Sequence, residues 1–185
     1  MYSMKKEHSD QTSITKLYVL MILTGGLYFF YWYISNVHKI KKHSKKDILV
    51  WWQTFGIFIP LVNFFFGYEY LKLVKENSQE ERIPVSWSPG WLLVGYLFLI
   101  ALRNFLSGDV LVNQGPLLLL VFQIVITLII TYPLELVQEP LNYYFEKKEK
   151  KKKLIINSLP TFLEIIFVVV SWLVLYGLST LRQIH

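Results

Sequence analysis

The chain has 185 residues and a formal net charge of +6, and 54% of its residues are hydrophobic while only 17% are charged. This composition is too apolar for an ordinary soluble domain, because a small fold cannot place so many apolar side chains in one core. The absence of cysteine excludes disulfide scaffolds, thiol redox centres and cysteine zinc sites. The composition therefore predicts a protein that is surrounded mainly by lipid.

Five stretches of low charge follow one another, and each has the roughly 20 residues that a helix needs to cross a bilayer. Their charged limits are Lys16 and Lys39, Asp47 and Glu69, Arg82 and Arg103, Asp109 and Glu135, and Lys153 and Arg182. We expect an all-α, polytopic integral membrane protein with four or five membrane helices. The last three, starting near residues 89, 116 and 159, are expected to span fully.

One membrane domain is expected, in four consecutive parts. These are a polar N-terminus (1–16), a first helical hairpin with a cytoplasmic helix (17–80), a second hairpin with an amphipathic, lysine-rich segment (81–157) and a last membrane helix (158–185).

The first two apolar segments contain residues that break helices. Thr24-Gly25-Gly26 divides the first segment, and Gly56 with Pro60 and Asn63 interrupts the second. Broken helices are tolerated where neighbouring groups or water bond the freed backbone. Either segment is therefore a candidate for a re-entrant one, which enters the membrane and returns on the same side.

The distribution of lysine and arginine predicts the orientation, because these residues mark cytoplasmic loops. The 104–116 connection is almost free of them and is expected outside, whereas the lysine run at 147–153 is expected in the cytoplasm. Five straight spans would then place the five lysines between residues 39 and 46 outside. We favour a cytoplasmic first loop with a re-entrant segment; the alternative is a five-span protein that departs from the bias once.

The residues from Thr24 to Tyr33 read TGGLYFFYWY and are followed by a basic loop. They resemble the Thr-x-Gly-hydrophobic-Tyr-x-x-Tyr-Trp signature of an uncharacterised family of small bacterial membrane proteins. The resemblance covers residues from about 17 to 80. It implies a bacterial origin and a location in the plasma membrane, and it carries over no catalytic residue.

Glu164 is the only formal charge inside the last apolar segment. Acidic residues at membrane depth are candidates for proton or cation handling. Glu164 follows Pro160 by four residues, so it should lie in the first turn of a helix, where the helix dipole stabilises a carboxylate at the wet boundary. We favour this structural role.

Two further polar patterns lie on the fourth segment and after it. Gln123, Thr127 and Thr131 form one stripe at four-residue spacing, which could line a pathway or join helices by hydrogen bonds; joining helices is the commoner use. Beyond Pro133, polar residues recur at helical spacing and predict an amphipathic helix at the interface, kinked or restarted at Pro140. These polar residues are Glu135, Gln138, Glu139, Asn142 and Glu146.

The lysine run that follows is expected to contact anionic membrane lipid. Its members are Lys147, Lys148, Lys150, Lys151, Lys152 and Lys153. The sequence contains no Gly-x-Ser-x-Gly, His-Glu-x-x-His or phosphate-binding glycine motif, so we expect no catalytic residues, cofactor or metal, and no nucleic-acid partner. The expected function is non-enzymatic, through contacts with lipid, other membrane proteins or a second copy. The alternative is a small transporter or channel subunit.

Overall fold

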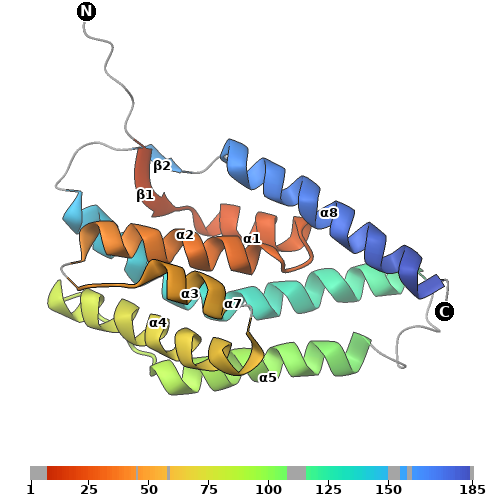
Figure 1. Cartoon of the computed structure of the whole chain (residues 1–185), viewed down its shortest axis with the longest axis horizontal. Helices are drawn as coiled ribbons and strands as arrows, with labels where there is room; N and C mark the ends of the chain where they lie inside the picture. Colours follow the sequence, from red (N-terminus) through yellow and green to blue (C-terminus); the bar gives the residue numbers. More distant parts are fainter. Residues whose placement is uncertain are drawn as a thin grey trace, which may run out of the picture.

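The fold was obtained as a computed structural model, which describes residues 8–44, 46–57, 59–107, 116–149, 155–157 and 160–183. In this part of the chain all regular structure is helical apart from two short strands, which confirms the all-α prediction (Figure 1). The elements are β1 (His8–Thr12), α1 (Ile14–Leu23), α2 (Tyr28–His43), α3 (Val50–Gly56), α4 (Pro60–Glu80), α5 (Pro89–Ser107), α7 (Pro116–Lys148), β2 (Ile155–Asn157) and α8 (Phe162–Gln183).

The first apolar segment is broken between α1 and α2, as the glycines predicted. Gly25 and Gly26 have φ angles of 58° and 93°, in the left-handed region that glycine adopts without a steric cost. The chain turns back at this point (Figure 1). As a result, Asp10 before α1 contacts His43 at the end of α2, with 2.7 Å between the carboxylate and the ring nitrogen. Both ends of the segment therefore lie at the same end of the molecule.

The second apolar segment is also broken where its sequence predicted. α3 ends at Gly56 and α4 begins at Pro60. Lys46, which precedes α3, forms an ion pair of 2.6 Å with Glu76 near the end of α4. The second segment thus also begins and finishes at one end of the molecule. We call this the charged end, and its residues are Asp10, Lys42, His43, Lys46, Glu76, Glu80, Glu81, Lys147, Lys148 and Glu149.

Two helices are long and apolar enough to cross a membrane, within Pro89–Leu106 and Leu120–Lys148. Their parent helices α5 and α7 begin at Pro89 and Pro116, because proline has no backbone N–H to lose at a first helical position. Ile14–Leu23 and Phe162–Val174 form shorter apolar helices. At least two helices therefore meet the requirements of a membrane span.

The surface of the molecule is strongly apolar. Large side chains such as Trp91, Phe98 and Phe162 are 65–79% exposed on α5 and α8. Inside the bundle, the polar side chains of Thr131 and Gln138 are fully buried. Soluble monomers rarely expose a continuous apolar surface of this extent. Lipid is the environment that this distribution fits.

The helix α7 continues through Pro140, so it does not restart there as one of the two predicted alternatives required. Proline has no N–H, and Pro140 therefore leaves the carbonyl of Leu136 without its usual helical donor. The indole N–H of Trp87 donates to this carbonyl at 2.8 Å. A side chain from the connection between α4 and α5 thus replaces the missing bond.

The residues after Pro133 continue α7 as part of the same helix. Two of them, Gln138 and Leu141, are fully buried. The reason is that α1, α4 and α5 all pack against α7. This part of α7 belongs to the centre of the bundle.

The two strands form a parallel pair that the sequence did not predict. His8 lies opposite Ile155, and Thr12 lies opposite Asn157. The pair joins the beginning of the described chain to the segment that leads into α8 (Figure 1).

Candidate functional site

Glu164 lies in the first turn of α8, as predicted, and its side chain is buried. The residue is only 4% exposed, because α1 and α2 cover it. The Lys16 ammonium of α1 lies 2.7 Å from one carboxylate oxygen. The Tyr28 hydroxyl of α2 donates to the other oxygen at 2.6 Å. The charge is therefore compensated inside the protein.

Thr161 donates two further hydrogen bonds to the Glu164 carboxylate. Its backbone N–H and its hydroxyl donate to the carboxylate at 2.7 and 2.8 Å, and the N–H of Glu164 points back to the hydroxyl at 3.4 Å. This reciprocal arrangement is a capping box, which the Thr-x-x-Glu spacing could have predicted. The partner Lys16 lies at the other end of the chain and gave no such signal.

A second buried polar network connects α2, α7 and β1. The side-chain oxygen of Gln138 accepts hydrogen bonds from the Trp32 indole at 2.6 Å and from the Asn36 amide at 3.0 Å. The amide of Gln138 donates to Asn142 at 2.8 Å. Asn142 in turn bonds the backbone N–H and carbonyl of Thr12, at 2.9 and 2.8 Å. These side chains bond the backbone of a strand and join three elements.

A polar cavity of about 150 Å³ lies between the two networks. Its lining includes Thr12, Asn36, Lys39 and Glu164. At roughly 30 Å³ per molecule it has room for about five waters. The Lys39 ammonium donates to the Thr12 hydroxyl at 3.1 Å, and burial lowers the pKa of Lys39 to about 8. The cavity therefore places an amine that titrates near neutral pH in the same space as a carboxylate.

The polar stripe of α7 is divided between two roles. Thr127 and Thr131 are buried, and the hydroxyl of Thr131 donates to the carbonyl of Thr127 in the same helix at 2.7 Å. Gln123 accepts a bond of 3.2 Å from the guanidinium of Arg103 on α5. Gln123 therefore joins two helices, whereas the Thr131 hydroxyl bonds its own helix.

Arg103 is a candidate residue that the sequence pattern did not indicate, because it lies at the charged limit of an apolar segment. Its guanidinium also donates to the carbonyl of Gly25 at 3.1 Å. Arg103 lines an apolar cavity of about 270 Å³ among the first hairpin, α4, α5 and α7. The available signal was that Arg103 is the only formal charge between Arg82 and Asp109.

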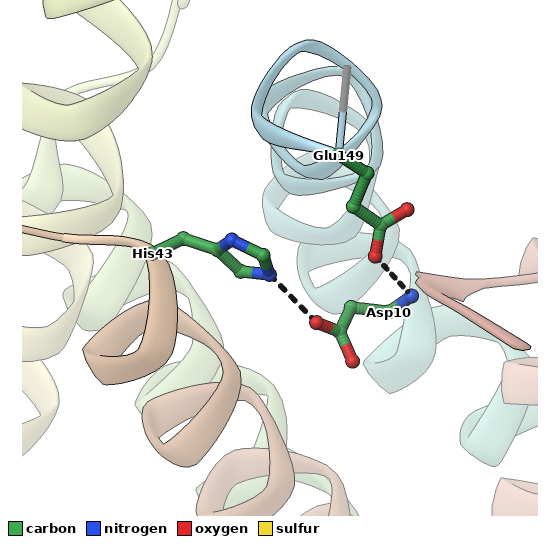
Figure 2. Close-up of side chains that lie close together, drawn as sticks. All are labelled: Asp10, His43 and Glu149. Carbon is green, nitrogen blue, oxygen red and sulfur yellow. Dashed lines mark hydrogen bonds and ion pairs between the residues drawn. The ribbon is translucent and has the colours of Figure 1, made fainter. Parts of the chain in front are cut away.

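Asp10, His43 and Glu149 bring three possible metal ligands together at the charged end (Figure 2). Their ligand atoms lie within 4.8 Å of one another. However, the Asp10 carboxylate already accepts bonds from His43 at 2.7 Å and Lys42 at 2.8 Å, and its N–H donates to Glu149 at 2.7 Å. Burial raises the pKa of the Asp10 carboxyl, but the bonds from Lys42 and His43 outweigh it and hold the pKa below 3.8. The cluster fastens β1 to the ends of α2 and α7.

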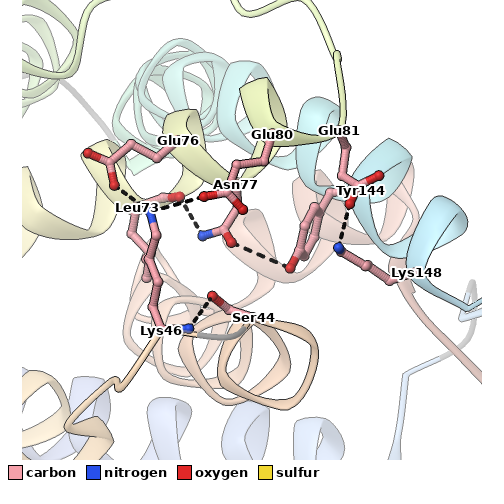
Figure 3. Close-up of polar contacts among 9 residues, drawn as sticks. All are labelled: Ser44, Lys46, Leu73, Glu76, Asn77, Glu80, Glu81, Tyr144 and Lys148. Atoms are coloured by element: carbon pink, nitrogen blue, oxygen red, sulfur yellow. Dashed lines mark hydrogen bonds and ion pairs between the residues drawn. The ribbon is translucent and has the colours of Figure 1, made fainter.

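The end of α4 is tied to its neighbours by a separate group of polar contacts (Figure 3). Lys46 pairs with Glu76, and the Tyr144 hydroxyl approaches the Asn77 side-chain oxygen at 3.5 Å. Lys148 pairs with Glu81 and lies 5.5 Å from the centre of the Tyr144 ring. These contacts join α4 to the loop after α2 and to the end of α7.

The predicted lipid-binding lysines are only partly described. Lys147 donates to the backbone carbonyl of Glu81, and Lys148 pairs with the Glu81 carboxylate. Lys150, Lys151, Lys152 and Lys153 lie outside the described residues. The two described lysines therefore contact protein.

Comparison with protein-family models, curated proteins and solved structures found no match to this chain. The resemblance of the residues from Thr24 to Trp32 to a family signature stays a prediction.

Proposed function

We propose that the chain is a multi-pass protein of the bacterial plasma membrane that acts without catalysis, through contacts with lipid, other membrane proteins or a second copy. The observation that carries the proposal is the distribution of polar and apolar groups. The buried groups of Glu164 and Gln138 bond other parts of the same chain, whereas large apolar side chains face outward. Such a molecule offers its surroundings an apolar surface and a charged end.

The proposed topology has three spans and two re-entrant hairpins. α5, α7 and α8 cross the membrane, while α1–α2 and α3–α4 enter from the cytoplasm and return. The contacts between Asp10 and His43, and between Lys46 and Glu76, support the two returns. This arrangement keeps the five lysines of the first loop in the cytoplasm, in agreement with the lysine bias.

Single cysteines test this topology, because the native chain has none to label. Cysteines at the exposed positions Lys41 and Glu146 should react with an impermeant thiol reagent only after the cells are permeabilised. A cysteine at Asn113 should react in intact cells. Labelling of the Lys41 position in intact cells would favour five straight spans.

Native mass spectrometry tests the proposed mode of action. The chain is released from nanodiscs that contain phosphatidylglycerol and phosphatidylcholine, and it should retain lipid or a second copy. Release as a bare monomer would contradict the proposal.

A transporter or channel subunit is the second candidate, and the polar cavity beside Lys39 and Glu164 favours it. An amine and a carboxylate that line one cavity with room for several waters could relay protons. Proton flux into liposomes that contain the protein would support this function if Lys39→Gln abolished the flux. Equal leakage with and without the protein would reject it.

A further inference from the structure

The apolar cavity lies inside the helix bundle and has an elongated wall. Along α5 its lining runs from Leu92 to Arg103, which corresponds to about 16 Å of helix axis. Phe29, Leu93, Ile100 and Val137 contribute apolar surface from three helices. The volume of about 270 Å³ is slightly below the range of about 300–1,000 Å³ for small-molecule sites. The shape suits one narrow apolar ligand.

Arg103 places a positive charge on this wall. Its two hydrogen bonds, to the carbonyl of Gly25 and to the side chain of Gln123, both go to uncharged oxygens. Among the residues described, no carboxylate lies within ion-pair distance of it. A guanidinium in a membrane helix is costly, and hydrogen bonds to neutral oxygens reduce this cost but leave the charge without a counter-ion.

Gly26 leaves the space that the guanidinium needs. A Cβ at this position would lie 3.1 Å from one terminal nitrogen of Arg103, and both residues line the cavity. The turn of the first hairpin therefore positions the arginine at the cavity wall through backbone contacts.

We propose that this cavity binds a single-chain anionic amphiphile, with its acidic head group at Arg103 and its alkyl chain along the wall of α5. An acidic head group supplies the negative charge that the Gly25 and Gln123 oxygens do not offer to Arg103. An alkyl chain fills the elongated apolar space along α5. A volume of about 270 Å³ suits one chain of short or medium length and excludes a lipid with two long chains. The inference rests on the proposed membrane location, from which such a ligand enters.

Photo-crosslinking tests the site in the full-length protein. The probes are a fatty acid with a mid-chain diazirine and the matching fatty alcohol, in phosphatidylcholine nanodiscs. The acid should label cavity residues such as Leu93 and Ile100. The alcohol should label them about tenfold less, since it lacks the charge-assisted bond. Equal labelling by the two probes would overturn the proposal.

Variants test the contribution of the Arg103 charge separately from that of the cavity space. Arg103→Gln should remove the preference for the acid, whereas Arg103→Lys should retain it. Leu93→Trp fills the cavity without touching the charge and should block labelling of Ile100. Phe98→Trp, at a 65% exposed position on the same helix, is the matched control and should change nothing. Unchanged labelling in Leu93→Trp would also overturn the site, even if Arg103→Gln fails to fold.

The position of the crosslinks distinguishes this inference from the proposed function. Labelling confined to outward positions such as Phe98 would reject the cavity site and keep the membrane location. No labelling at any position would contradict both. Competition by laurate alone would assign a carboxylate head group, and competition by dodecyl phosphate alone would assign a phosphate, each in support of the proposal.

Discussion

At Glu164, donors from three elements bond one carboxylate: Lys16 from α1, Tyr28 from α2 and Thr161 from the cap of α8. The helix dipole alone would contribute only about 0.3–1 kcal/mol to such a group. Because Glu164 forms a buried ion pair with Lys16, the loss of its charge costs more stability than the helix dipole alone would suggest. The Lys16 side chain is 2% exposed, so removal of the carboxylate would leave it buried without its partner.

Glu164→Gln should therefore destabilise the protein by about 3–5 kcal/mol, the usual cost of removing one partner of a buried ion pair. Denaturant unfolding in detergent micelles measures this loss. Glu139→Gln, at an exposed position of α7, is the control and should stay within about 0.5 kcal/mol of the native chain. Adding Lys16→Met to Glu164→Gln should recover most of the loss. Native-like stability of the single variant would show that the pair is unimportant.

The lowered pKa of the Asp10 carboxyl predicts how the packing of β1 against the ends of α2 and α7 depends on pH. Its pKa in the folded protein is held below the ordinary value of 3.8. Its contribution to stability is therefore present above pH 3.8 and is lost as the pH falls through the lower, folded value. Hydrogen exchange of β1, corrected for intrinsic rates, should increase below pH 3.8. Asp10→Asn should exchange faster at neutral pH and show no such step; the same step in this variant would assign it to another group.

At the scale of single residues, local features were predictable from the sequence, whereas contacts between distant helices were not. The position of Glu164 in a first turn followed from Pro160, because that information is local. Its partner Lys16 and the inward position of Arg103 depend on the packing of helices far apart in the chain. A pattern along one segment contains no information about such contacts.

At the scale of elements, the breaks and starts of helices were predictable from glycine and proline. The turn at Gly25 and Gly26 requires positive φ angles, and α4, α5 and α7 each begin at a proline. The continuity of α7 was not predictable, because the donor that replaces the missing N–H of Pro140 comes from another element. The pairing of β1 with β2 was also not predictable, because the two strands come from distant parts of the chain.

Trp87→Phe should destabilise the protein by about 1–3 kcal/mol, because the partly buried carbonyl of Leu136 loses the donor that replaces the missing N–H of Pro140. In a Pro140→Ala background the helix regains its own N–H at this position, so the same substitution should cost less. A double-mutant cycle of unfolding free energies measures the difference. An equal loss in both backgrounds would mean that Trp87 acts through packing alone.

At the scale of the whole molecule, five of the six ion pairs of the described residues lie at the charged end, and large apolar side chains are exposed on α5 and α8. The composition predicted a membrane environment, and the structure has two helices that meet the requirements of a span. The lysine distribution predicted the side of the charged end but not how its groups pair. Lys147 and Lys148, for example, are both bonded to Glu81.

We therefore expect the lysine run to have two parts: Lys147 and Lys148 contact protein, and the four lysines after them contact lipid. Replacing only Lys150, Lys151, Lys152 and Lys153 by Gln should reduce retained anionic lipid nearly as much as replacing all six lysines. Each basic residue near an anionic surface contributes about 1 kcal/mol at most, and salt weakens it. Native mass spectrometry from mixed-lipid nanodiscs measures retention. Undiminished retention in the six-fold variant would leave the run a role in orientation only.

The pairing of the first helices with the last one also sets a time scale for biogenesis. Tyr28 and Glu164 are 136 residues apart in the chain. At about 5–20 residues per second, a ribosome needs roughly 7–27 s to make the residues between them. During this interval Lys16 and Tyr28 have been synthesised without their carboxylate partner, so the first hairpin cannot complete its packing until Glu164 has been made.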